Sequence, residues 1–141
     1  MILSFKDLKK NLKKDTTLLP KIRIALLGDT ATQFLAMGIQ GLGIESGFNI
    51  VIFEADFNQI EGQILNPTSE LYSFNADYVV VFQSTHKLLS KYNKTPIDKQ
   101  RLLAEERIDF VVKAANSLQV PLIYFNYPEI DDAVYGSYAN K

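Results

Sequence analysis

Cysteine is absent from this chain of 141 residues, which excludes disulfides, thiolate nucleophiles and cysteine-bound metals. The same absence is compatible with the cytosol, so we expect a cytoplasmic location. Long hydrophobic runs are missing too, since no stretch approaches the roughly 20 apolar residues that cross a bilayer. The N-terminal sequence lacks the continuous apolar core of a signal peptide. A formal net charge of −1 gives no general attraction to nucleic acid, so we expect neither a membrane nor a nucleic acid as partner.

Several ligand-binding signatures are absent as well. The chain has no Gly-Lys-Ser/Thr ending of a P-loop and no dinucleotide-binding glycine pattern behind its first predicted strand. A receiver domain would need an aspartate at the end of the third predicted strand, where Phe82-Gln83 stands. Paired acids near loop ends are usually solvated, so we expect no metal site from the acidic residues there, which are Glu54, Asp56, Asp131 and Asp132.

Apolar strand patterns and helical patterns alternate along the chain, and the 47% hydrophobic content is enough for one domain with a core. The predicted strands are Ile22–Leu27, Asn49–Glu54, Asp77–Phe82 and Val120–Phe125. Helices are predicted over Ala31–Ile44, over 57–64 and from Pro96 to Ser117, the last with an inner stripe of Ala104, Ile108, Val111, Ala115 and Leu118. Right-handed crossovers then give an α/β three-layer sandwich with a parallel sheet of flavodoxin-like order 2-1-3-4.

The two ends of the chain differ from this pattern. Residues 1–20 predict a basic amphipathic helix with a linker, the helix packing on its own domain or on a partner, and 21–141 form the α/β domain. A sheet of this type usually has a fifth strand and a closing helix. We therefore expect the domain to lack its closing strand, either because it is minimal or because it is the N-terminal part of a longer protein.

Polar residues follow the ends of neighbouring predicted strands. In the order 2-1-3-4 the loops Gly28–Thr32 and Gln83–His86 lie side by side at the switch point, where open α/β sheets bind ligands. The sequence therefore predicts a substrate-binding rim, which consists of Gly28, Asp29, Thr30, Gln83, Ser84 and Asn126.

The segment Gly28-Asp29-Thr30 resembles the Gly-Asp-Ser nucleophile block of SGNH (GDSL-type) hydrolases, with threonine in place of serine. The resemblance implies Thr30 as a catalytic nucleophile, with Gln83 in the place of the oxyanion-hole amide donor. The base that such a hydroxyl needs would be His86, the one histidine of this sequence, or a histidine beyond Lys141. The Asp-x-x-His pattern that those enzymes carry late in the chain is missing. The residues alone equally allow an Asp/Thr helix cap at Gly28–Thr30 and an exposed helix-start histidine at His86.

Three longer segments resemble the N-terminal domain of FkbH-like proteins: LLGDTATQFL (26–35), FEADFNQIEGQILNPTSELYSFNADYVVVFQST (53–85) and YFNYPEIDDAVYGSYANK (124–141). In that family an SGNH-like domain precedes a catalytic domain of the haloacid dehalogenase (HAD) superfamily, subfamily IIIC. The resemblance implies transfer of a glyceryl unit to an acyl carrier protein after removal of phosphate. It implies Mg²⁺ in the HAD domain and no cofactor in this chain, which lacks the Asp-x-Asp-x-Thr signature of that domain.

Three hypotheses for the function stay open at this point. The first is an accessory domain that positions substrate, a carrier protein or the catalytic domain, and is inactive alone. The second is an esterase or acyltransferase that uses Thr30. The third is a purely structural interaction domain.

Overall fold

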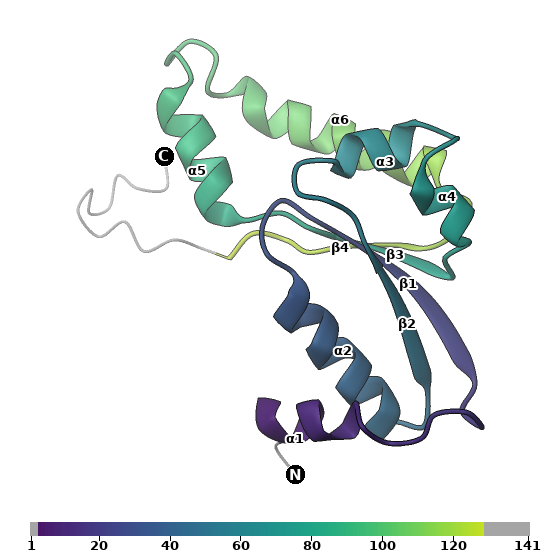
Figure 1. Ribbon diagram of the computed structural model, residues 1–141. Helices are drawn as coiled ribbons and strands as arrows, with labels where there is room; N and C mark the ends of the chain where they lie inside the picture. The colour runs from purple at the N-terminus through teal and green to yellow at the C-terminus, as the bar shows by residue number, and fades with distance from the viewer. Residues whose placement is uncertain (1–2, 129–141) are drawn as a thin grey trace.

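The computed structural model describes residues 3–128, and its centre is a four-stranded parallel sheet (Figure 1). The strands are β1 (Lys21–Gly28), β2 (Asn49–Glu54), β3 (Tyr78–Phe82) and β4 (Leu122–Tyr124). Their order is β2-β1-β3-β4, and every neighbouring pair is parallel, so the predicted sheet order is confirmed. The predicted residues Asp131 and Asp132 lie outside the described residues.

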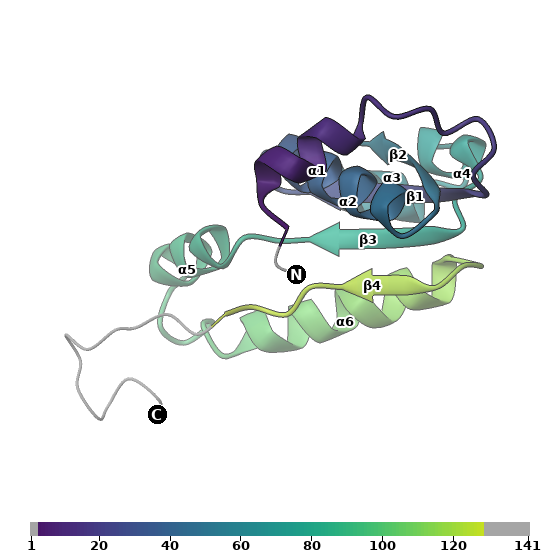
Figure 2. The same ribbon diagram turned by 90° about the horizontal axis from the view of Figure 1, so that it is seen from below.

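Helices cover both faces of the sheet and give the predicted three layers (Figures 1 and 2). One face carries α1 (Phe5–Asn11) and α2 (Gln33–Glu45). The opposite face carries α3 (Ile60–Leu65), α4 (Glu70–Phe74) and α6 (Leu102–Ser117). Helix α5 (Thr85–Lys94) leaves the carboxyl end of β3 and continues beyond the sheet (Figure 2). Within residues 3–128, no helix has both the length and the apolar character needed to cross a bilayer.

The two central strands supply side chains to both cores because successive residues of a strand point to opposite faces. Leu27 and Val81 are fully buried on the α6 side, where Phe110 packs against them. On the other side, Leu26 and Val80 form a smaller cluster with α2. Burial on both faces explains why β1 and β3 read as nearly continuous apolar runs.

Helix α1 packs against α2, which is the first of the two alternatives for the N-terminal helix. Ser4 begins α1 with a reciprocal pair of capping hydrogen bonds to Asp7. The buried Asn11 side chain donates to the backbone oxygen of Gly41 at 3.1 Å and to the Glu45 carboxylate at 2.9 Å. Glycine at position 41 lets the two helix backbones approach, since a Cβ there would lie 2.8 Å from the carbonyl carbon of Leu8.

The segment between β3 and β4 differs from its prediction in two ways. The lysine-rich residues after His86 belong to α5, although the alternative of a helix-start histidine at His86 was the only sign of a helix drawn from the sequence there. The helix expected from Pro96 begins instead at Leu102. Residues 96–101 form turns, which the Gln100 side chain ties to α5 by donating to the backbone oxygens of Tyr92 and Thr95.

The predicted inner stripe of α6 is wrong at three positions. Ala104, Ile108 and Ala115 are exposed, and Ile108 is 63% accessible. The buried side chains are Leu103, Phe110, Ala114 and Leu118. The apolar residues of α6 form two overlapping stripes along the helix. The stripe that contains the large Phe110 ring faces the sheet. Burying that ring removes more apolar surface from water than burying Ile108 would.

Gly41→Ala is expected to lower the free energy of unfolding by about 1–3 kcal/mol, because the added methyl overlaps the Leu8 backbone and forces α1 away from α2. Gly38→Ala in the same helix is the matched control, since a Cβ at position 38 meets nothing within 4 Å. That control should gain about 0.5–1 kcal/mol from helix propensity alone. Urea unfolding of both variants checks the pair, and equal effects would contradict the close approach of α1 and α2.

Candidate functional site

The loops that follow β1 and β3 are joined at the carboxyl edge of the sheet, side by side as expected. The Asp29 backbone N–H donates to the Phe82 carbonyl at 3.2 Å. The Ser84 backbone N–H donates to both carboxylate oxygens of Asp29, at 2.9 and 3.0 Å. The tight turn requires glycine at position 28, because a Cβ there would lie 2.5 Å from the Thr32 methyl. The Asp29 carboxylate thus connects the two loops.

The predicted nucleophile and base do not form a hydrogen-bonded pair in residues 3–128. Thr30 is half-buried, and its hydroxyl makes no hydrogen bond within that range. His86 is exposed in the first turn of α5. The N-cap residue of α2 is Thr32, whose hydroxyl donates to Glu54 at 2.5 Å and does not cap the helix. Asn126 is exposed beyond β4.

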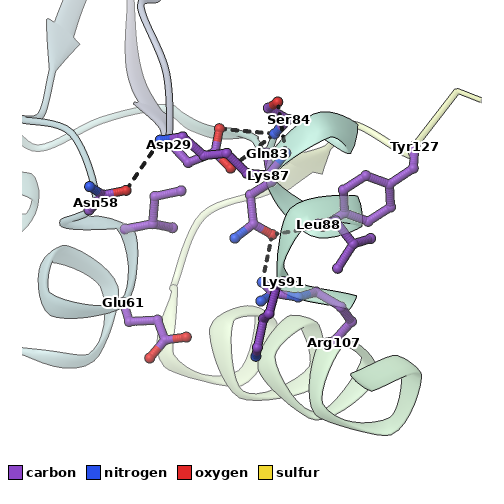
Figure 3. A pocket seen from close by; sticks show the side chains of 11 residues that line it. Asp29, Asn58, Glu61, Gln83, Ser84, Lys87, Leu88, Lys91, Arg107 and Tyr127 are labelled. Carbon is purple, nitrogen blue, oxygen red and sulfur yellow. Dashed lines mark hydrogen bonds between the residues drawn. The ribbon is translucent and has the colours of Figure 1, made fainter. Parts of the chain in front are cut away.

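A cavity of about 280 Å³ opens between the β1 and β3 loops, α5 and α6 (Figure 3). Of the predicted rim residues, Asp29, Gln83 and Ser84 line it, whereas Gly28, Thr30 and Asn126 do not. His86 is not among its lining residues either. The rest of its wall consists of Asn58, Ile60, Glu61, Lys87, Leu88, Lys91, Arg107 and Tyr127.

Basic side chains reach the cavity from two helices. Lys87 and Lys91 are one turn apart on α5, and Arg107 comes from α6 (Figure 3). The Lys87 ammonium donates to the Asn58 side-chain oxygen at 3.4 Å, and Lys91 pairs with Glu106 at 2.8 Å. In the described part of the chain, neither Lys87 nor Arg107 has a carboxylate oxygen within 4.0 Å. The wall near these two residues is therefore electropositive.

The side-chain oxygen of Gln83 is the centre of a polar cluster behind the cavity. It accepts hydrogen bonds from the Tyr124 hydroxyl at 2.6 Å, Arg107 at 3.0 Å and the Tyr127 hydroxyl at 3.2 Å. The two tyrosine oxygens are themselves 3.0 Å apart. Burial, followed by the hydrogen bond with Tyr127, raises the pKa of Tyr124 well above its usual value of 10.0. Tyr124 therefore stays protonated at physiological pH.

Several functional candidates were missed by sequence reasoning, namely Asn58, Lys87, Lys91, Arg107, Tyr124 and Tyr127. The spacing of Lys87 and Lys91 was an available signal, because residues four apart share one face of a helix. Nothing in the sequence indicated Arg107, which lies 24 positions from Gln83 and reaches it only through the fold. Among the described residues, no group of three or more histidine or acidic side chains is arranged to hold a metal ion.

The fold and this edge define an α/β domain with a polar pocket at the switch point of a parallel sheet. Residues 23–141 match the family described as FkbH, N-terminal domain, and the chain belongs to that family. No curated protein matches the chain.

A similar solved structure is described as the N-terminal part of the protein BF1531 from Bacteroides fragilis, containing a phosphatase domain and complexed with Mg. It is 50% identical with a TM-score of 0.93, and the match covers 99% of this chain. This chain spans 37% of the length of that one.

Alkaline titration tests the state of Tyr124. The pKa of Tyr124 is raised in the folded protein, so its contribution to stability is complete below the unfolded pKa of about 10 and is lost as the pH rises through the folded pKa. Tyrosinate absorbance is measured against pH in the wild type and in Tyr124→Phe. The difference between the two curves should rise only above about pH 10. A difference curve centred near the pKa of free tyrosine would contradict the buried cluster.

Proposed function

We propose that this chain is the accessory domain of an FkbH-like protein whose catalytic domain is a phosphatase of the HAD superfamily. The domain, with its SGNH-like edge, holds part of a substrate or of a carrier protein close to that catalytic domain and is not catalytic alone. The observation that supports this proposal is the set of contacts made by the Gly28-Asp29-Thr30 turn. The Asp29 carboxylate accepts hydrogen bonds from the Ser84 amide, and the Thr30 hydroxyl has no base as partner in residues 3–128.

The similar protein from Bacteroides fragilis supports the assignment of a catalytic domain, because its solved part is described as containing a phosphatase domain and Mg. In this proposal Mg²⁺ belongs to that catalytic domain. The family resemblance extends the proposal to transfer of a glyceryl unit onto an acyl carrier protein thiol in the cytoplasm. The cavity beside Asp29 offers the place where the domain would contact such a substrate.

Steady-state kinetics of the intact protein that carries this domain test the accessory role. Lys87→Ala removes a cation from the cavity wall, and we expect it to raise the KM of the complete reaction by about tenfold with little change in kcat. Hydrolysis of a small phosphate ester by the phosphatase domain should not change. Lys94→Ala, at the end of the same helix and outside the cavity lining, is the matched control.

Mass spectrometry after incubation with an activated acyl probe separates the other hypotheses. The accessory role predicts no adduct on Thr30, and Thr30→Ala should keep full activity. An adduct on wild-type protein that Thr30→Ala abolishes would establish an acyltransferase instead. Kinetics unchanged by Lys87→Ala and by every other cavity substitution would leave a purely structural domain.

A further inference from the structure

We infer that the cavity beside Asp29 binds an oxyanion, a carboxylate or phosphate group of the ligand, and that the side-chain amide nitrogen of Gln83 is its oriented hydrogen-bond donor. This inference rests on the proposed function, because it names the ligand class of the same cavity. Three features support it, which are the fixed orientation of Gln83, the charge of the wall and the size of the cavity.

The orientation of the Gln83 amide is determined by its partners. A guanidinium has only donors, so the Gln83 atom that faces Arg107 at 3.0 Å must be the oxygen. The hydroxyl of Tyr124 adds a second donor to the same oxygen at 2.6 Å. The amide nitrogen then points away from these donors, toward the cavity (Figure 3). Within residues 3–128 this nitrogen has no acceptor, so its two N–H groups are available to a ligand.

The charges of the wall favour an acceptor with negative charge. Arg107 contacts the Gln83 side chain and Lys87 lines the same cavity, and neither has a carboxylate oxygen within 4.0 Å in the described range. Two carboxylates also line the cavity. Both oxygens of Asp29 accept the Ser84 amide, and Glu61 lies across the cavity from Arg107 (Figure 3). An oxyanion near Gln83 would meet amide and cationic donors, whereas a ligand cation there would meet like charge.

The size of the cavity limits what it can hold. Its volume of about 280 Å³ is just below the range for small-molecule sites, which begins near 300 Å³. A carboxylate or phosphate with a few attached carbons fits such a space, and the rest of a longer ligand would extend outside it.

The test is NMR of the 15N-labelled full chain titrated with inorganic phosphate, and separately with acetate, at constant ionic strength set by chloride. We expect the side-chain NH₂ resonances of Gln83 to move and saturate with at least one of the two anions. The anion that binds with the higher affinity identifies the ligand group as a phosphate or a carboxylate. Chloride alone should leave these resonances unchanged.

Gln83→Glu is the decisive variant, because its carboxylate keeps an acceptor for Arg107 and Tyr124 while the donor into the cavity is lost. We expect it to weaken anion binding by at least about tenfold. Gln119→Glu makes the same change of charge at an exposed site outside the cavity and should bind as the wild type does. Lys87→Ala, on an exposed side chain, is a second variant that should also weaken binding if Gln83→Glu disturbs the fold.

Tyr124→Phe tests the positioning of Gln83. Loss of the 2.6 Å hydrogen bond should shift the Gln83 NH₂ resonances before any anion is added, and then weaken binding. Absence of any saturable shift with phosphate and acetate would overturn the inference. If no anion binds but Lys87→Ala still raises the KM of the intact protein, the accessory role is supported and only the assignment of an oxyanion ligand is wrong.

Discussion

The hydrogen bonds between the Asp29 carboxylate and the Ser84 amide are the interaction on which the edge of the sheet depends. They join the residue after β1 to the N-cap of α5, which follows β3. Strands β1 and β3 are the two central strands of the sheet. A carboxylate placed at the first turn of a helix also complements the helix dipole. Because Asp29 fixes where α5 begins, it also fixes the positions of Lys87 and Lys91 on the cavity wall. Its role in this account is structural, although the Gly-Asp-Thr pattern resembles a catalytic block.

A second constraint is the polar cluster around the Gln83 side-chain oxygen. Its donors come from α6, from β4 and from the residues after β4, so it connects parts of the chain that are 24 to 44 positions apart. Gln83 is half-buried, and the three donors satisfy the side-chain oxygen on its inner side. Because the oxygen has three donors, the amide nitrogen, which has no acceptor among residues 3–128, is the polar atom that faces the cavity (Figure 3). The same contacts that stabilise the edge thereby determine which chemistry it presents.

The sheet could be predicted from the sequence because its strands are short apolar runs separated by helical patterns. Burial on both faces produces a run such as Tyr78–Phe82, and the alternation with helices requires parallel pairing. The juxtaposition of the two loops followed as well, since Asp29 and Gln83 directly follow strands that the order 2-1-3-4 makes neighbours. These predictions depended only on local pattern and on general rules of topology.

Predictions that needed side-chain detail succeeded less well. Helix α5 is polar along most of its length and has no buried residue, and the prediction did not use the spacing of Leu88 and Tyr92, which puts both on one face of a helix. The inner face of α6 was misassigned because two apolar stripes overlap and only packing against the sheet selects Phe110 over Ile108. Arg107 and Tyr124 belong to the site through contacts across the fold, and no spacing in the sequence encodes such contacts.

The most direct test of the central claim is the hydrogen-exchange rate of the Ser84 backbone amide, measured by NMR in wild-type protein and in Asp29→Ala. If the Asp29 carboxylate joins the two loops, the Ser84 amide exchanges slowly in the wild type and much faster in the variant, while the amides of β1 and β3 stay protected. A Ser84 amide that exchanges in the wild type as fast as a freely exposed one would contradict the account.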